Sequence, residues 1–194
     1  EISGRNSERL LKWSDSGQPS LGAGVAWFEP EFNDSSWSSG AAPFGYGFDN
    51  IATNLASRIQ AKSPSFYMRR RFTANAEQAL NEVSLQFAVE YNDGFIAYIN
   101  GVEVVRCNMG PAQMFFYADQ FAFNSSSTSG ISEIITITAD PTLLVEGENL
   151  LAIHVANRDL NSPIKFDMEL RLEADDAKLI TVGSIWNYTD GNIE

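Results

Sequence analysis

Two segments alternate strictly between apolar and polar residues, and this period of two constrains the fold more than any other feature. In IKFDMELRL (164–172) apolar residues take every second position and charged residues the positions between, and VSLQFAVEY (83–91) repeats the pattern. Successive side chains of a β-strand point to opposite faces. Each segment is therefore predicted to be a strand with one buried face and one solvent-facing side.

Turn signals separate these strands from further β-rich runs. Asn100-Gly101 lies between FIAYI and VEVV, and both residue types tolerate the positive φ of a type I′ hairpin turn. Additional strands are predicted in residues 65–74, 132–139 and 149–157. Many short strands separated by Gly, Asn, Asp and Ser turns favour an all-β chain, folded as an antiparallel β-sandwich.

Helical signals are weak. Residues 51–62, residues 75–82 and the segment PTLLVEG could each hold a turn or two, and none reaches three turns with a cap at each end.

Residues 14–50 combine much of the Gly, Pro and Ser with seven aromatic side chains, a content that disordered segments rarely carry. We expect residues 14–50 to form a long ordered connection across the sandwich, with its rings filling the edge of the core.

Composition excludes several classes of function. The 194 residues include 25 acidic and 13 basic side chains, giving a formal charge of −12. This balance argues against nucleic acid and anionic membrane surfaces as partners, because both require a surplus of Lys and Arg. No run of about 18 apolar residues exists, so no membrane insertion is expected. A single cysteine and a single histidine argue against a disulfide framework, a Cys-rich zinc site and a two-histidine metal motif.

Catalysis is not expected from these residues. A general base of the Ser-His-Asp type would have to be His154, and no G-x-S-x-G segment accompanies it. We interpret His154 as a surface or packing residue and Cys107 as a small buried or half-buried one. No carboxylate pair stands out for glycoside chemistry, although such a pair is spatial rather than sequential. In the run Arg69-Arg70-Arg71, we expect one arginine to meet a buried carboxylate such as Asp93 or Asp167.

Four segments taken in order resemble a known module: FNDSSWSSGAAPFGYG, SFYMRRRFTA, VEYNDGFIAYINGVEVVRCNMG and LLVEGENLLAIHVANRDLNSPIKFDMELRL. They are similar to the galactose-binding-like jelly-roll module of large secreted bacterial proteins, to the jelly-roll domain of β-galactosidases and to carbohydrate-binding modules. The resemblance covers about residues 9–173. It implies an all-β, antiparallel β-sandwich of the jelly-roll type and a non-catalytic role in binding carbohydrate.

Calcium is a candidate structural ion. The chain is also distantly similar to protective-antigen-type sugar-binding domains, whose paired aspartates hold calcium. In this chain the pair reads Asn92-Asp93, so one carboxylate is missing. Calcium takes six to eight oxygen ligands, which loops rich in Asp, Asn and main-chain carbonyls supply. The candidate loops are residues 45–54 and 157–162.

A sugar site needs an exposed aromatic ring for the apolar face of a pyranose and planar polar groups for its hydroxyls. Trp27 and Tyr117 are the aromatic candidates, because both fall outside the predicted strands. The alternative is that these rings belong to the core. Polar candidates near predicted strand ends are Arg106, Asn108, Arg158 and Asp159.

Residues 1–176 are predicted to form one jelly-roll domain, and residues 177–194 a linker followed by a further strand. That strand either closes this sandwich or begins a following repeat, because residues 185–190 resemble residues 10–15. We expect the chain to be part of a larger protein with neighbouring domains. Abundant Ser and Asn with scarce Lys favour a secreted or cell-surface location.

The sequence therefore predicts a non-catalytic carbohydrate-binding or accessory module of a secreted multidomain bacterial protein, with a polysaccharide or glycan as partner. The alternative is a structural or protein-interaction spacer at the cell surface that has no glycan ligand. An exposed aromatic platform at one loop end favours the first hypothesis. A smooth acidic surface with every ring buried favours the second.

Overall fold

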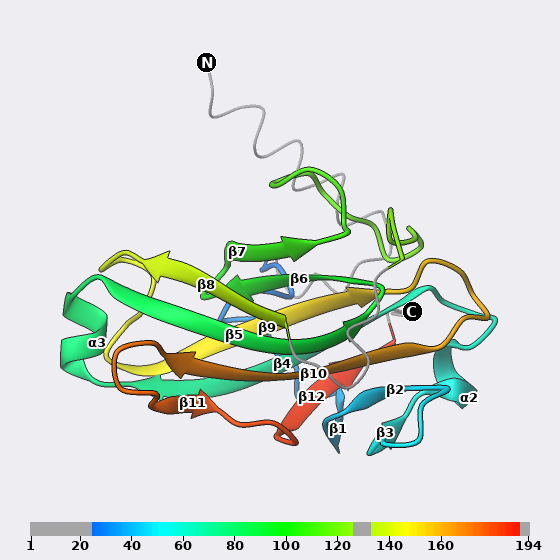
Figure 1. Ribbon diagram of the computed structural model, residues 1–194, viewed down its shortest axis with the longest axis horizontal. Coiled ribbons are helices and arrows are strands. Elements are labelled where there is room, and N and C mark those ends of the chain that lie inside the picture. Colours follow the sequence, from blue (N-terminus) through cyan, green and yellow to red (C-terminus); the bar gives the residue numbers. More distant parts are fainter. Residues whose placement is uncertain (1–24, 126–132, 191–194) are drawn as a thin grey trace.

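Two β-sheets pack face to face in the computed structural model, which describes residues 25–125 and 133–190 (Figure 1). In spatial order, the first sheet contains β1 (Ser38–Ala41), β12 (Ile185–Thr189), β4 (Ser65–Ala74), β9 (Gly147–Ala156), β6 (Gly94–Ile99) and β7 (Val102–Cys107). The second contains β3 (Thr53–Asn54), β2 (Phe44–Tyr46), β10 (Ile164–Leu172), β5 (Val83–Asn92) and β8 (Glu133–Ala139), with β11 (Lys178–Ile180) paired to β10. The short helices α2 (Ala56–Ile59) and α3 (Ala76–Leu80) lie at opposite ends of the sandwich (Figure 1).

The predicted antiparallel β-sandwich is confirmed. The paired strands are antiparallel apart from the parallel pair β2–β3. Strands that follow one another in sequence, such as β4, β5 and β6, alternate between the two sheets, which is the type of connection that a jelly roll uses. The inward-facing side chains of both sheets therefore meet in one central core.

The period-two pattern builds that core. Phe166 and Met168 of β10 and Phe87 of β5 are buried against Phe66 and Met68 of β4. Full burial of a side chain of this size contributes about 1.5–3 kcal/mol. The strands predicted at residues 65–74 and 164–172 coincide with β4 and β10.

The outer face of β10 differs from the expected solvent-facing side. Lys165 is 3% exposed and Glu169 is 7% exposed. Lys165 Nζ lies 2.6 Å from a carboxylate oxygen of Glu90 on β5, and Glu169 lies 2.7 Å from Lys178 Nζ on β11. Alternation indicates which side chains share a face, whereas segments from elsewhere in the chain decide whether that face is covered.

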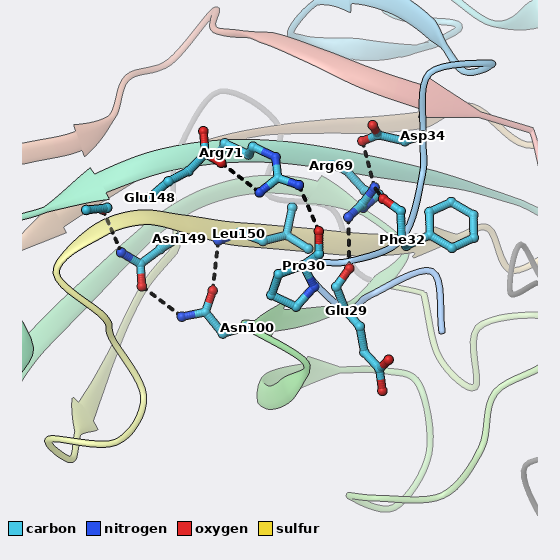
Figure 2. Close-up of polar contacts among 11 residues, drawn as sticks. Glu29, Pro30, Phe32, Asp34, Arg69, Arg71, Asn100, Glu148, Asn149 and Leu150 are labelled. Atoms are coloured by element: carbon cyan, nitrogen blue, oxygen red, sulfur yellow. Dashed lines mark hydrogen bonds and ion pairs between the residues drawn. The ribbon is translucent and has the colours of Figure 1, made fainter. Parts of the chain in front are cut away.

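The hairpin between β6 and β7 forms as predicted. Asn100 and Gly101 have φ values of 48° and 88°, the positive range that a type I′ turn requires. The Asn100 side chain donates to Asn149 Oδ1 at 2.7 Å and accepts from the Leu150 main-chain N–H at 2.9 Å (Figure 2). The turn is thereby joined to the beginning of β9.

Residues 25–37 cross the outer face of the first sheet. Trp27 packs there with Tyr67 of β4, and Arg69 of β4 fixes the segment with hydrogen bonds to the carbonyls of Glu29 at 2.9 Å and Phe32 at 3.0 Å (Figure 2). The expected connection therefore exists over residues 25–37. The residues after it form β1 and β2 instead, and residues 14–24 lie outside the described part.

Two arginines of the run meet carboxylates, Arg69 with Asp34 and Arg71 with Glu148, and neither partner is one of those expected. The Arg69 guanidinium lies 2.7 Å from Asp34, whereas Asp93 and Asp167 bond to main-chain N–H groups elsewhere. The prediction of the partner was wrong because Arg69 points outward from the first sheet. Residues 25–37 cover that face and supply the carboxylate.

The C-terminal strand β12 lies within the first sheet, between β1 and β4. Trp186 and Tyr188 belong to the central core, with 1% and 9% of their surfaces exposed. Arg58 of α2 forms an ion pair with Asp190 at 2.9 Å. These contacts place residues 185–190 in the present sandwich rather than in a detached following repeat.

Across residues 25–125 and 133–190, no helix has the length and apolar character needed to cross a membrane.

Candidate functional site

Three loops meet at one end of the sandwich and enclose a hollow of about 340 Å3, which we call the loop-end hollow. One loop is the corner between β5 and β6, the second connects β9 to β10, and the third leads into the segment before β8. The hollow is lined by Asn92, Asp93, Ser125, Arg158, Asp159, Ser162 and Pro163. Loops at the end of a rigid sandwich are a frequent location for ligand sites.

Asp93 holds two of these loops together. Its carboxylate accepts a hydrogen bond from the Arg158 main-chain N–H at 2.9 Å, and its main-chain carbonyl accepts one from Asn108 Nδ2 at 2.8 Å. Asp93 is only 4% exposed. Two predicted site residues, Asn108 and Arg158, are thus both bonded to Asp93, which lines the hollow.

Charged groups of both signs reach the surface of the loop-end hollow. The exposed Arg158 side chain donates from Nη1 to Ser125 Oγ at 3.0 Å. The exposed Asp159 carboxylate accepts from the main-chain N–H groups of Asn161 and Ser162 and from the Ser162 hydroxyl. These hydrogen bonds, that from the Ser162 side chain above all, lower the pKa of Asp159. The hollow therefore offers a strong donor beside an ionised acceptor.

Exposed aromatic residues lie on the segment that leads to Ser125, which lines the loop-end hollow. Phe121 and Phe123 are 44% and 57% exposed. The Phe123 main-chain N–H donates to the Asn108 carbonyl at 2.8 Å, which fixes this segment to the site. Tyr117 is half-buried on the same loop, with its ring 4.6 Å from that of Phe115. Neither phenylalanine was among the sequence-based candidates, although FFYADQFAF places several aromatic residues outside every predicted strand.

Arg106 supports the aromatic loop from inside. Its side chain is 6% exposed and forms a two-pronged pair with Glu103, with distances of 2.8 and 2.7 Å. The same guanidinium donates to the carbonyls of Met109 at 2.6 Å and Met114 at 2.8 Å. A guanidinium held by a carboxylate and two carbonyls is strongly fixed. Arg106 therefore positions the loop and does not reach a ligand, contrary to the expectation.

Trp27 lies away from this site. It is 1% exposed, and its ring is 4.8 Å from that of Tyr67 and 5.6 Å from that of Tyr98. The expectation that Trp27 stacks on a sugar was wrong because residues 25–37 press this ring inward against the sheet. Its apolar surface contributes to folding instead.

His154 and Cys107 occupy positions unsuited to catalysis. His154 is 1% exposed, and burial, with a smaller contribution from the charge of Arg106, lowers its pKa to about 3. Its ring stacks on Tyr67 at 4.1 Å. Burial likewise raises the pKa of the half-buried Cys107 thiol, which makes a thiolate less accessible.

Each of the two candidate calcium loops already has a positive charge close to its oxygen atoms. In residues 157–162, Arg158 adds a positive charge beside the Asp159 carboxylate, which disfavours a second cation there. In residues 45–54, Asn50 Oδ1 accepts from Lys165 Nζ at 2.9 Å, so an ammonium already occupies that position. The described residues contain no group of three or more His, Cys, Asp and Glu placed to hold a metal. Calcium needs several free oxygens converging on one point.

Comparison with known proteins gives limited likenesses. No family model matches the chain, and no curated protein matches it. Similar solved structures include a Streptomyces avermitilis α-L-rhamnosidase complexed with L-rhamnose (17% identity, 79% of this chain and 12% of that chain, TM-score 0.41). The Pleurotus ostreatus lectin in its apo form is also similar (13% identity, 81% of this chain and 39% of that chain, TM-score 0.37). A third similar structure is a PA14 sugar-binding domain from an RTX adhesin (19% identity, 61% of this chain and 53% of that chain, TM-score 0.28). This chain spans about half or less of the length of each of these three proteins.

Proposed function

We propose that this domain is a non-catalytic carbohydrate-binding module, and that the loop-end hollow with its adjoining aromatic loop is the binding site. The observation that carries the proposal is the exposure of Phe121 and Phe123 on the segment that leads to Ser125, which lines the hollow together with Arg158 and Asp159. Two exposed aromatic rings separated by one residue form a larger apolar surface than a single exposed side chain, and such surfaces often mark a binding site.

The chemistry of this site suits a saccharide. The apolar face of a pyranose ring packs on an exposed aromatic ring, which Phe123 supplies. Sugar hydroxyls both donate and accept hydrogen bonds, and the hollow presents a guanidinium of Arg158 and a carboxylate of Asp159 for these two roles. A few convergent polar groups beside an apolar surface are the usual composition of a small-molecule site.

The absence of catalysis is part of the same proposal. The single histidine of the chain is buried with a depressed pKa, so it has neither the access nor the basicity of a general base. We further propose a galactose-binding-like jelly roll acting as an accessory module in a larger secreted or cell-surface bacterial protein. The alternation of consecutive strands between the sheets supports the jelly-roll assignment.

A spacer module without a glycan ligand is the second candidate. The observation that favours it is that polar groups lining the hollow already form hydrogen bonds with one another. Asp93 accepts from the Arg158 main-chain N–H, and Asp159 accepts from the Ser162 main-chain N–H. Such a network also stiffens a loop end that has no ligand. The two functions differ in what the exposed phenylalanines do.

The test compares Phe123→Ala with Leu80→Ala, a matched truncation of a side chain that is 75% exposed on α3, at the far end of the sandwich (Figure 1). The two variants and the unaltered protein are applied to a glycan array. Calorimetry then measures the affinity for each glycan to which the unaltered protein binds. We expect Phe123→Ala to weaken binding at least tenfold while Leu80→Ala binds normally, with melting temperatures nearly unchanged in both. Equal binding by both variants, or no binding of the unaltered protein to any glycan, would favour the spacer module without a glycan ligand.

A further inference from the structure

A second hollow lies on the first sheet, where β12 separates from β4. The pairing of these strands covers only Tyr67, Met68 and Arg69 of β4, and ends before Arg70. A hollow of about 250 Å3 opens there, which we call the arginine hollow. It is lined by Asp34, Arg69, Arg70, Arg71, Leu150, Ile185 and Asn187. The proposed carbohydrate site uses none of these residues.

Positive charge dominates the lining of the arginine hollow. Three guanidinium groups line it, against the single carboxylate of Asp34. Arg69 pairs with Asp34 at 2.7 Å, and Arg71 pairs with Glu148 at 2.9 Å outside the lining (Figure 2). Arg70 forms no ion pair with any carboxylate in the described residues. The hollow therefore concentrates positive charge on a chain whose formal charge is −12.

Two of these guanidinium groups retain unused donors. Arg69 is 1% exposed, and its Nε is buried without a hydrogen-bond partner. Arg70 donates from Nη1 to the Ile185 carbonyl, and its Nε is likewise buried without a partner. Burial alone lowers the pKa of Arg70, since no neighbouring carboxylate opposes the effect. A buried N–H donor without a hydrogen-bond partner carries a desolvation cost that a bound acceptor would remove.

An oxyanion matches this arrangement. The planar guanidinium presents paired N–H donors whose spacing fits two oxygens of a carboxylate, sulfate or phosphate. Asn187 adds a side-chain amide to the lining, while Leu150 and Ile185 supply apolar walls that reduce competition from water. The volume of the hollow suits one such group rather than an extended polyanion.

We propose that the arginine hollow binds a single oxyanion group, with Arg70 as its principal ligand and Arg69 and Arg71 reinforcing the positive field. The group is either a free inorganic anion or the carboxylate or sulfate of an acidic saccharide. This site is separate from the loop-end hollow, so it holds whether or not the aromatic loop binds a sugar.

The experiment titrates the protein with sodium sulfate, sodium glucuronate and neutral glucose at constant ionic strength, following the amide NMR signals of Ile185 and Asn187. The variants are Arg70→Gln and the matched control Lys62→Gln, which removes one exposed positive charge that does not line the hollow. We expect saturable shifts with sulfate or glucuronate and none with glucose. Arg70→Gln should weaken the affinity at least tenfold, and Lys62→Gln should retain it.

The titration also separates the two sources of the anion. Tighter binding of glucuronate than of sulfate assigns a saccharide carboxylate, whereas the reverse assigns a free anion. If Arg70→Gln fails to fold, Arg70→Lys takes its place in the titration. This variant keeps the charge but not the paired donors, so it should bind the anion more weakly than the unaltered protein. Phe123→Ala should leave anion binding intact, so the two proposals fail independently. Unsaturable shifts in the unaltered protein, or equal affinities for Arg70→Gln and Lys62→Gln, would overturn the proposal.

Discussion

Acidification should destabilise this domain through one buried side chain, His154. Its ring lies within 4.1 Å of Tyr67, 5.4 Å of Phe116 and 6.2 Å of Trp27, measured between ring centroids, and the nearest charge acting on it is the cation of Arg106. Burial first and Arg106 second lower its pKa from 6.5 to about 3. The folded domain therefore holds the imidazole neutral under conditions in which an unfolded chain protonates it.

The sign and size of the effect follow from that difference in pKa. Between pH 6.5 and about 3 the unfolded chain binds one more proton at His154 than the folded domain, so the free energy of unfolding falls as the pH falls. Stability from this group is fully present above the unfolded pKa. Each pH unit below it costs about 1.4 kcal/mol, which amounts to about 2 kcal/mol between pH 7 and pH 5.

Urea denaturation at pH 7, 6 and 5 measures this loss, and His154→Phe supplies the comparison. Phenylalanine preserves the stacking on Tyr67 and removes the titration, and no bond is lost at Nε2, which has no hydrogen-bond partner. Burial raises the pKa of Asp167, so protonation of Asp167 affects the free energy of unfolding with the opposite sign. Because Asp167 is present in both proteins, this contribution cancels when their pH profiles are compared. We expect the variant to lose about 2 kcal/mol less than the unaltered protein between pH 7 and pH 5. Parallel pH profiles would refute the reasoning.

Three further predictions concern stability. Deleting residues 177–194 should cost several kcal/mol or give insoluble protein, because Trp186 alone contributes about 1.5–3 kcal/mol of burial; unchanged denaturation curves would contradict the assignment of β12 to this sandwich. Asp34→Asn should lower the free energy of unfolding by about 1–3 kcal/mol, because Arg69 loses its carboxylate while remaining buried; an unchanged urea midpoint would argue against this pairing. Chelation of calcium should leave the melting temperature unchanged, and a drop of several degrees would show that a loop does hold the ion.

Local sequence determined the positions of the main strands and of one turn. Residues 65–74 and 164–172 became β4 and β10 without a shift in their bounds, and Asn100-Gly101 became the predicted hairpin turn. Alternation and turn propensity act through neighbouring residues, so both are legible in a single sequence. Asn108 and Arg158, two of the polar candidates near strand ends, both bond to Asp93, and their role in binding stays a prediction.

Only the tertiary structure decided which rings are exposed. Trp27 and Phe123 both lie outside the predicted strands and are equally apolar in the sequence, yet Trp27 is 1% exposed and Phe123 is 57% exposed. The outward face of Arg69 and the location of β12 were decided in the same way, by contacts with segments distant in sequence. Periodicity fixes the direction in which a side chain points relative to its own strand. Exposure depends on the part of the chain that packs over it, and no local pattern carries that information.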